Sequence, residues 1–536
     1  MGSVSLIVSW FGSDLRIGQC RVQPKVEYRQ VDGAEMPWRA GGIGRADAAE
    51  VARKDGRPIY GGTPSDRSVI EGLRALSASR RKAIFYPLIL MEQLGGNGLT
   101  DPYGATEQPA MPWRGCITTS VAPGRAGTTD GTSAAVDQVA AFFGSAAPTD
   151  FARIGETVTY SGPAEWSYRR FILHYAHVCA AAGGIDAFLI GSEMVAMTQI
   201  RGPGNTYPAV AALRCLAADV RGIIGPNVKI GYASDWSEYF GHHPGNGALF
   251  FHLDPLWADP NIDFIGIDNY MPLSDWRDGD DHLDASWGRI DNIDYLRANV
   301  AGGEGYDWFY ASDADRLAQN RTPITDGAYD EAWVWRYKDL TGWWQNLHYN
   351  RPGGVRQREA TAWVPGSKPI WLPSSAAPPW TRRRTSRTSS WTRCRPRACC
   401  RISPTVRGTM RSRLPMSRRR WRIGATPPTT RSMPMACGCW TWTARMSVLG
   451  RAALSGLSGA RRSVVGRSCV GSRTLAERAC GRRHAARGRH GHLQGCGCKR
   501  RRCVRNIRRG AGLCPAGFRI RAGALQPLML AHGLTR

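Results

Sequence analysis

The first 371 residues alternate short, almost continuously apolar segments with amphipathic helical segments. The segments predicted as strands are residues 4–11, 83–91, 187–193, 228–234, 262–270 and 368–371. The segments predicted as helices are residues 65–82, 164–182, 207–224 and 330–348. Strands that are apolar on both faces are typical of parallel sheets covered by helices. We therefore expect an α/β fold, a (β/α)8 TIM-type barrel. An open doubly wound sheet is the alternative, although no Gly-x-Gly-x-x-Gly turn follows the first strand.

The charge of the chain changes abruptly near residue 371. Residues 1–370 contain 34 Lys and Arg against 42 Asp and Glu, a net charge of −8, whereas residues 371–536 contain 37 against 1. The first part has no apolar run of about 18 residues that could span a bilayer, and no signal peptide is recognised at its start. We therefore expect a globular domain at residues 1–371 and a separate tail at residues 372–536.

Polar and aromatic side chains gather at the predicted carboxyl ends of the strands, where TIM barrels hold their active sites. These candidate site residues are Trp10, Asp14, Tyr86, Glu193, Asp235, Trp236, Asp268, Asn269 and Tyr270. Flat aromatic rings stack on the apolar face of a sugar, while carboxylates and amides bind its hydroxyl groups. Retaining glycosidases use two carboxyl groups about 5–5.5 Å apart, and Glu193 is the candidate acid/base. We expect no metal and no cofactor.

Each candidate also has a structural interpretation. The Glu193 carboxylate could cap a helix or bind an arginine, and Trp10 and Trp236 could cover the end of the barrel. Asp268, Asn269 and Tyr270 could form a turn before Pro272. The sugar-site hypothesis depends on the joint placement of these residues.

Six sequence segments carry a family resemblance. They are VSWFGSDLRIGQCRVQPKVE (8–27), YGGTPSDRSVI (60–70), DPYGATEQPAMPWRG (101–115), FLIGSEM (188–194), YASDWSEYFGH (232–242) and DFIGIDNYMPLSDWRDG (263–279). In this order they resemble the glycoside-hydrolase-like TIM-barrel domain of the large tail, or host-specificity, protein of gene transfer agents and related phage tails. The resemblance covers nearly all of residues 4–371.

The resemblance implies a component of a virion-like particle tail, assembled in the cytoplasm, that binds or cuts cell-wall or capsule polysaccharide and contacts other tail proteins. It places Glu193 as acid/base at the end of strand 4, and Asp268, Asn269 and Tyr270 at the end of strand 6. Ser192 departs from the Asn-Glu pair of related glycosidase barrels. The nucleophile expected after strand 7 is missing, because the chain continues there as WLPSSAAPPW. The barrel is therefore expected to be incomplete after strand 7, and this chain to be inactive as an O-glycosyl hydrolase.

The resemblance stops within a residue or two of Trp371, which suggests a change of reading frame. Plausible GC-rich codons for residues 373–381, read two bases later, yield Glu-Leu-Gly-Cys-Pro-Ala-Val-Asp, a segment like the missing motif. The same shift makes residues 401–413 acidic and family-like. The tail also has 36 Arg but one Lys, and no Asp or Tyr. We therefore expect a disordered frameshift product from about Leu372 onward.

Three functional hypotheses remain open. The first is a wall- or capsule-directed glycosidase, and the second is a non-catalytic binding or structural tail module. The third is non-specific nucleic-acid binding through the arginine-rich tail, by release of counterions from phosphate. The tail cysteines and histidines around Cys496 and Cys498 are a poor match to the spacing of zinc sites.

Sequencing the gene across codons 368–380 tests the frameshift. We expect a one-base insertion or deletion near codon 372, because two separate segments regain family-like sequence in the same shifted frame. If the sequenced gene shows no such insertion or deletion, the arginine-rich tail is a genuine product of that gene.

Overall fold

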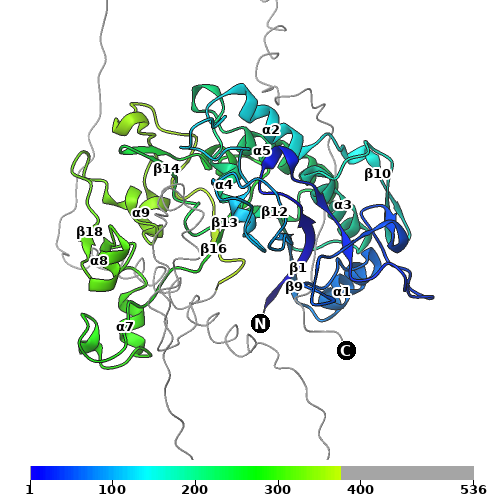
Figure 1. Cartoon of the computed structure of the whole chain (residues 1–536), viewed down its shortest axis with the longest axis horizontal. Coiled ribbons are helices and arrows are strands. Elements are labelled where there is room, and N and C mark those ends of the chain that lie inside the picture. Colours follow the sequence, from blue (N-terminus) through cyan, green and yellow to red (C-terminus); the bar gives the residue numbers. More distant parts are fainter. Residues whose placement is uncertain (1, 376–536) are drawn as a thin grey trace, which may run out of the picture. The chain divides into compact units, whose positions relative to one another are not determined.

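The computed structural model describes residues 2–375 (Figure 1). The tail at residues 372–536 lies almost wholly outside this range. The predictions of disorder, of nucleic-acid binding and of poor zinc motifs in the tail therefore concern residues that the structure does not describe. Leu372 to Ser375 are described and follow the end of the last strand at Trp371. Asn269 forms an isolated parallel bridge with Ser375, and the Asn269 amide donates to the Ser374 carbonyl at 2.9 Å.

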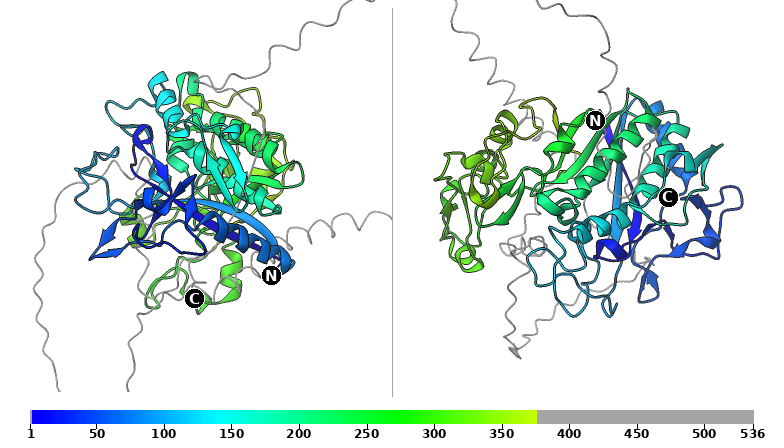
Figure 2. Two further views of the ribbon diagram at one scale, coloured as in Figure 1. Left: turned by 90° about the vertical axis from the view of Figure 1, so that its right-hand side faces the viewer. Right: turned by 90° about the horizontal axis from the view of Figure 1, so that it is seen from above.

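The described residues are built around one seven-stranded sheet with the order β19-β16-β13-β12-β9-β1-β2. Its strands are β1 Ser3–Gly12, β2 Val22–Gln23, β9 Lys82–Met91, β12 Ala187–Ser192, β13 Lys229–Asp235, β16 Phe264–Asp268 and β19 Ile370–Trp371. Six of them pair in parallel, and only β2 runs antiparallel to its neighbour β1. The strands and their covering helices can be followed from two further sides in Figure 2. The predicted α/β class is confirmed, whereas the sheet does not close into a barrel within residues 2–375.

The strand numbering expected from the family resemblance is wrong for these residues. β12 pairs directly with β9, since Ala187 lies opposite Ile84 and Phe188 opposite Phe85. No strand of residues 2–375 lies between the two. Glu193 therefore follows the third parallel strand rather than the fourth, and Asp268 ends the fifth.

The sheet has different residues on its two faces. One face carries a small apolar layer in which the Phe264 and Trp371 rings stack with centroids 4.1 Å apart. The members of this layer are Ile7, Ile84, Tyr86, Ala187, Leu189, Ala233, Phe264 and Trp371. The other face meets the helices and forms the larger core, where Phe85 and Phe188 stack at 4.8 Å. Burial on both faces explains why these strands are continuously apolar.

Three of the predicted helices are present near their predicted positions. They are α1 Asp66–Ala78, α3 Tyr168–Ala181 and α5 Pro208–Ile224. Serine side chains cap the first two, because the Ser65 Oγ accepts from the Ser68 amide and the Ser167 Oγ from the Arg170 amide. The remaining α-helices are α2 Ser133–Phe143, α4 Val195–Thr198, α6 Asp254–Trp257, α7 Ile293–Ala298, α8 Asp313–Ala318 and α9 Leu340–Gln345.

The loops contain short two-stranded sheets. They are β3 Lys25–Val26 with β6 Ala49–Glu50, β4 Arg39–Ala40 with β5 Ile43–Gly44, β7 Arg53–Lys54 with β8 Arg57–Pro58, β10 Phe151–Ile154 with β11 Thr157–Tyr160, β14 His242–Gly245 with β15 Ala248–Phe250, and β17 Trp308–Phe309 with β18 Thr322–Pro323. The long loop between β9 and α2 contains the 3-10 helix η3 (Arg114–Cys116).

The predicted helix at residues 330–348 is wrong. The chain forms a 3-10 helix, η7 (Ala332–Trp335), and then the separate helix α9. Between them the buried Lys338 Nζ donates to the carbonyls of Asn299 and Gly302, each at 3.0 Å. The Asp339 side chain then caps α9 by accepting from the Gly342 amide. A buried lysine followed by a new N-cap interrupts the helical pattern that the apolar spacing suggested.

An insertion of about one hundred residues separates β16 from β19 and contains α7, α8, α9, β17 and β18, which appear in green in Figure 1. Ion pairs hold its first half together. The Arg321 guanidinium contacts the carboxylates of Asp275 and Asp284, each at 2.8 Å, and lies over the Trp308 ring.

Arg170 offers a test of what fixes the start of α3 to the segments that pack around it. Its guanidinium lies between the rings of Trp166 and Tyr160, 3.8 and 3.9 Å from their centroids, and donates to the carbonyls of Glu165 and Gly41. We expect Arg170→Ala to lower the free energy of unfolding by about 2–4 kcal/mol in denaturant titrations.

Arg170→Lys should recover less than half of this loss, because an ammonium cannot reproduce the planar stack and the forked donors. The control is Arg289→Ala, which removes an exposed ion pair to Asp291 and should change the free energy by less than about 0.5 kcal/mol. Equal losses for Arg170→Ala and the control would contradict the role of Arg170.

Candidate functional site

Three carboxyl groups lie at the carboxyl end of neighbouring parallel strands. Asp235 and Asp268 are register partners at the ends of β13 and β16. Glu193 follows β12, and its amide donates to the Ala233 carbonyl at 2.8 Å. All three are buried, with exposed fractions of 4 % for Glu193, 2 % for Asp235 and 0 % for Asp268. The sheet thus concentrates negative charge in an environment that water reaches poorly.

Glu193 is held by two donors from the long loop between β9 and α2. The Trp113 Nε1 and the Arg114 Nη2 both donate to the Glu193 Oε2, each at 2.9 Å. The Arg114 Nε also donates to the Ser192 carbonyl at 3.0 Å. The sequence analysis did not identify Trp113 and Arg114 as site residues. The available signal was their place in the PWRG end of a family-like segment.

The backbone of Glu193 is strained. Its φ of +49° lies in the left-handed region, which is uncommon for a residue other than glycine. Backbone strain of this kind often accompanies functional sites, because surrounding contacts must hold it in place. The ion pair with Arg114 agrees with the structural interpretation, in which the Glu193 carboxylate binds an arginine. The two hydrogen bonds that its Oε2 accepts fix the direction of the carboxylate.

Arg114 is the positive charge of the cluster. Burial would lower the pKa of its guanidinium, but the electrostatic attraction of its acidic neighbours, Glu193 first among them, raises it above its ordinary value. Arg114 therefore stays charged in this buried position. It is the group that compensates for the carboxylates around it.

Asp268 lies deepest in the cluster. The Tyr86 hydroxyl donates to its Oδ2, and the Ser374 amide donates to its Oδ1 at 3.1 Å. Burial raises the pKa of Asp268 well above its ordinary value, and the charge of Glu193 raises it further, whereas the bond from Tyr86 and the charge of Arg114 oppose this shift. Burial and the charges of Asp268 and Glu193 also raise the pKa of Tyr86. Asp268 thus keeps its proton to higher pH than an exposed aspartate does.

The end of the last described strand contributes Ser374 rather than a carboxylate. The Ser374 Oγ is 2.6 Å from the Tyr270 hydroxyl, and the Ser374 carbonyl accepts from the Asn269 amide. Burial raises the pKa of Tyr270 to about 12. Ser374, and not a carboxylate, is therefore the residue of this segment that contacts Asp268.

Asp235, Trp236 and Asn269 are engaged in local contacts. The Asp235 Oδ1 accepts from the amide and the hydroxyl of Ser237. The Trp236 ring meets the Tyr337 ring edge-on at 4.7 Å, and the Asn269 Oδ1 accepts from the Met271 amide. The last contact is the turn before Pro272 that the structural interpretation of Asn269 describes.

Trp10 and Asp14 have other partners. Trp10 has no exposed surface, and its Nε1 donates to the Tyr175 hydroxyl of α3, so it packs on the helix side of β1. Asp14 pairs with Arg16 at 2.7 Å and accepts from the Gln108 Nε2. Although burial raises the pKa of Asp14, these bonds hold it below its ordinary value. The structure therefore brings Tyr86, Glu193, Asp235, Asp268 and Tyr270 into one region and gives Trp10 and Asp14 structural contacts.

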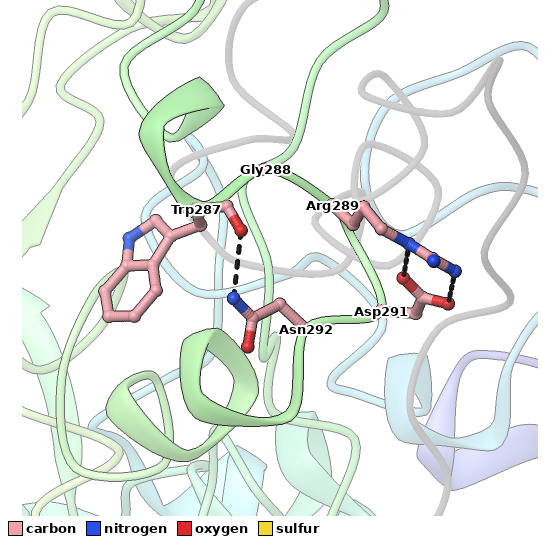
Figure 3. Close-up of a pocket in the computed structure, with 5 residues that line it drawn as sticks. All are labelled: Trp287, Gly288, Arg289, Asp291 and Asn292. Carbon is pink, nitrogen blue, oxygen red and sulfur yellow. Dashed lines mark hydrogen bonds and ion pairs between the residues drawn. The ribbon is translucent and has the colours of Figure 1, made fainter.

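A separate cavity of about 400 Å³ lies at the start of α7. It is lined by Trp287, Gly288, Arg289, Asp291 and Asn292 (Figure 3). Its Arg289–Asp291 ion pair is largely exposed, and the Asn292 Nδ2 donates to the Trp287 carbonyl. Because it contains no buried charged group, we do not place the functional site there.

The described residues 2–375 contain neither a metal-binding cluster nor a membrane-spanning helix. No group of three or more His, Cys, Asp or Glu side chains in this part could hold a metal ion. None of its helices combines the length and the apolar composition needed to cross a membrane.

The described residues form a mostly parallel α/β fold with three buried carboxyl groups at its strand ends. Residues 166–387 match the family model of the GTA TIM-barrel-like domain, the gene transfer agent domain that the sequence motifs resemble. The matched range contains Glu193, Asp235 and Asp268, begins after the three N-terminal motifs and extends past Trp371. No curated protein matches the chain.

The raised pKa of Asp268 predicts a pH dependence of stability. An acid whose pKa is higher in the folded than in the unfolded state binds its proton more tightly when folded. Its contribution to stability is therefore present below the unfolded pKa, about 3.9, and is lost as pH rises towards the folded pKa.

We expect the free energy of unfolding to fall less steeply between pH 4 and pH 8 in Asp268→Asn than in the unaltered chain. Denaturant titrations across this range measure both slopes. Parallel slopes would show that Asp268 titrates normally in the folded protein.

Proposed function

We propose that the domain at residues 1–371 is a glycan-binding module on a glycosidase-type scaffold, which binds cell-wall or capsule polysaccharide without cleaving it. The observation that carries the proposal is the cluster of Glu193, Asp235 and Asp268 with Trp113 and Arg114 at the carboxyl ends of the strands. Carboxylates that accept hydrogen bonds from hydroxyls, next to aromatic rings, are the groups that sugar sites commonly combine.

Two features favour binding over turnover. The residue next to Asp268 from the last described strand is Ser374, which supplies an amide and a hydroxyl instead of a nucleophilic carboxylate. The Glu193 Oε2 is occupied by two donors, one of them the charged Arg114. A general acid must deliver a proton to the glycosidic oxygen, and a carboxylate fixed as an acceptor is poorly arranged for this.

A hydrolase is the second candidate function. Glu193 and Asp268 are close enough for the charge of Glu193 to raise the pKa of Asp268. In glycosidases, the acid and its partner are two carboxyl groups whose environments give them different pKa values. In this mechanism Asp268, whose pKa is raised, would carry the proton.

The match to the gene transfer agent domain supports a place in a particle of that kind. We propose a tail component that is assembled in the cytoplasm, contacts other tail proteins and reaches the polysaccharide of the recipient cell. The frame change near codon 372 is part of this proposal, since it explains why a carboxylate is missing next to Ser374. A purely structural tail component is the alternative.

Co-sedimentation of the full chain with purified peptidoglycan sacculi, or with capsule polysaccharide, tests the proposal. We expect binding by the unaltered chain. Binding by Glu193→Gln should be about tenfold weaker, because this substitution removes the negative charge that interacts with both Arg114 and the ligand. Asp291→Asn, in the exposed cavity near α7, is the matched control and should bind as the unaltered chain does.

The release of reducing ends is measured in the same samples. No release is expected; release that disappears in Glu193→Gln would establish the hydrolase instead. Failure to bind either polysaccharide, or equal binding by Glu193→Gln, would favour the structural alternative.

A further inference from the structure

A buried polar chain centred on Glu238 lies beneath the strand-end carboxylates. Glu238 follows β13 and has no exposed surface. Its Oε1 accepts from the Thr198 Oγ1 at 2.6 Å and from the Tyr232 hydroxyl at 2.9 Å, and its Oε2 accepts from the Asp235 amide at 3.0 Å. One carboxyl group therefore connects helix α4, strand β13 and the turn that follows β13.

The first arm of this chain leads to Glu193. The Tyr232 hydroxyl, which donates to Glu238, accepts from the Met194 amide at 2.9 Å. Met194 directly follows Glu193, whose left-handed φ needs contacts on both sides to persist. The Glu193 amide is held by the Ala233 carbonyl, and the Met194 amide by Tyr232. The orientation of Tyr232, and with it this backbone, depends on Glu238.

The second arm leads to Asp235. The Glu238 side chain accepts from the Asp235 amide, while the Glu238 amide donates to the Asp235 carbonyl at 2.8 Å. This reciprocal pair closes the turn from which the Asp235 carboxylate projects. The same side chain thus fixes the backbone beneath two of the three carboxylates of the cluster.

We propose that Glu238 is a positioning residue that holds Glu193 and Asp235 in their relative arrangement at the ends of β12 and β13. The inference deepens the proposed function, because it takes these two carboxylates as the groups that meet the glycan. Glu238 itself contacts no ligand in this arrangement. Its role is exerted through Tyr232 and the backbone of residues 193–194 and 235.

The titratable groups that face Glu238 are Asp235 and Tyr232 on β13, Tyr168 on α3 and, through Thr198, His252. Burial raises the pKa of Glu238 to about 8, with the charge of Asp235 adding to it and the bonds from Thr198, Asp235 and Tyr232 opposing it. Burial lowers the pKa of His252 to about 3 and raises that of Tyr232, so both stay neutral near pH 8.

The sign of the pH effect follows from this arrangement. The folded site favours the neutral Glu238 carboxyl, because ionisation creates a buried charge beside Asp235. As pH rises through about 8, ionisation therefore favours local opening of the turn, and fewer molecules keep the binding arrangement. A residue with a merely structural role would not impose this pH profile on ligand binding.

The test compares Glu238→Gln and Glu238→Ala in the full chain, with peptidoglycan sacculi as the probe from pH 6 to pH 9. Glutamine mimics the neutral carboxyl, so Glu238→Gln should bind within about twofold of the unaltered chain at pH 6 and lose the weakening above pH 8. Glu238→Ala should bind about tenfold more weakly at every pH.

The matched control is Asp219→Asn. Asp219 is also buried, with a pKa raised by burial, but it pairs with Arg169 between α5 and α3. Asp219→Asn should keep the pH profile of the unaltered chain. Glu238→Ala with unaltered affinity, or Glu238→Gln with an unaltered pH profile, would overturn the proposal.

A second measurement is independent of glycan binding. In protein labelled with ¹⁵N-methionine, the Met194 amide resonance, assigned by Met194→Leu, should shift with a midpoint near pH 8 and should not shift in Glu238→Gln. A Met194 resonance insensitive to this titration overturns the positioning role. If the unaltered chain binds no sacculi but Met194 shifts as expected, the proposed function fails while the positioning role stands.

Discussion

Several carboxyl groups can be buried together only if a positive charge or a bound proton compensates for them, and this structure uses both. Arg114 supplies the charge to Glu193, and Asp268 retains a proton beside Tyr86. The loop between β9 and α2 must therefore fold back over the strand ends for the cluster to exist. The arrangement of the site depends on this contact between the loop and the end of β12, which are distant in sequence.

The parts of the fold that sequence patterns predicted well are those dominated by burial. β1, β9, β12, β13 and β16 are apolar because both of their faces are covered, and this pattern is readable without a structure. The direct pairing of β12 with β9 was missed, because strand order depends on long-range register, which composition does not encode. The break between η7 and α9 was missed because its cause, the capture of Lys338 by two carbonyls, is a tertiary contact.

The candidate site shows the same division. Glu193, Asp235 and Asp268 could be named in advance, since strand ends in parallel sheets share one edge. Arg114 could not, because it comes from a loop whose path no periodicity describes. Trp10 was named from its position in sequence, but the alternation of side chains along β1 directs it to α3. Glu238 lies three residues after the end of β13, and only its hydrogen bonds reveal that it connects two strand ends.

The open side of the sheet has a consequence for the backbone amides of β1. Along Ser3–Gly12 this strand pairs with β9, whereas β2 reaches only Phe11 and Gly12 from the other side. In a parallel ladder, alternate amides point to opposite neighbours. Every second amide in the N-terminal half of β1 therefore has no strand partner within residues 2–375. One strand therefore contains two kinds of backbone amide, which differ in whether a neighbouring strand of this sheet holds them.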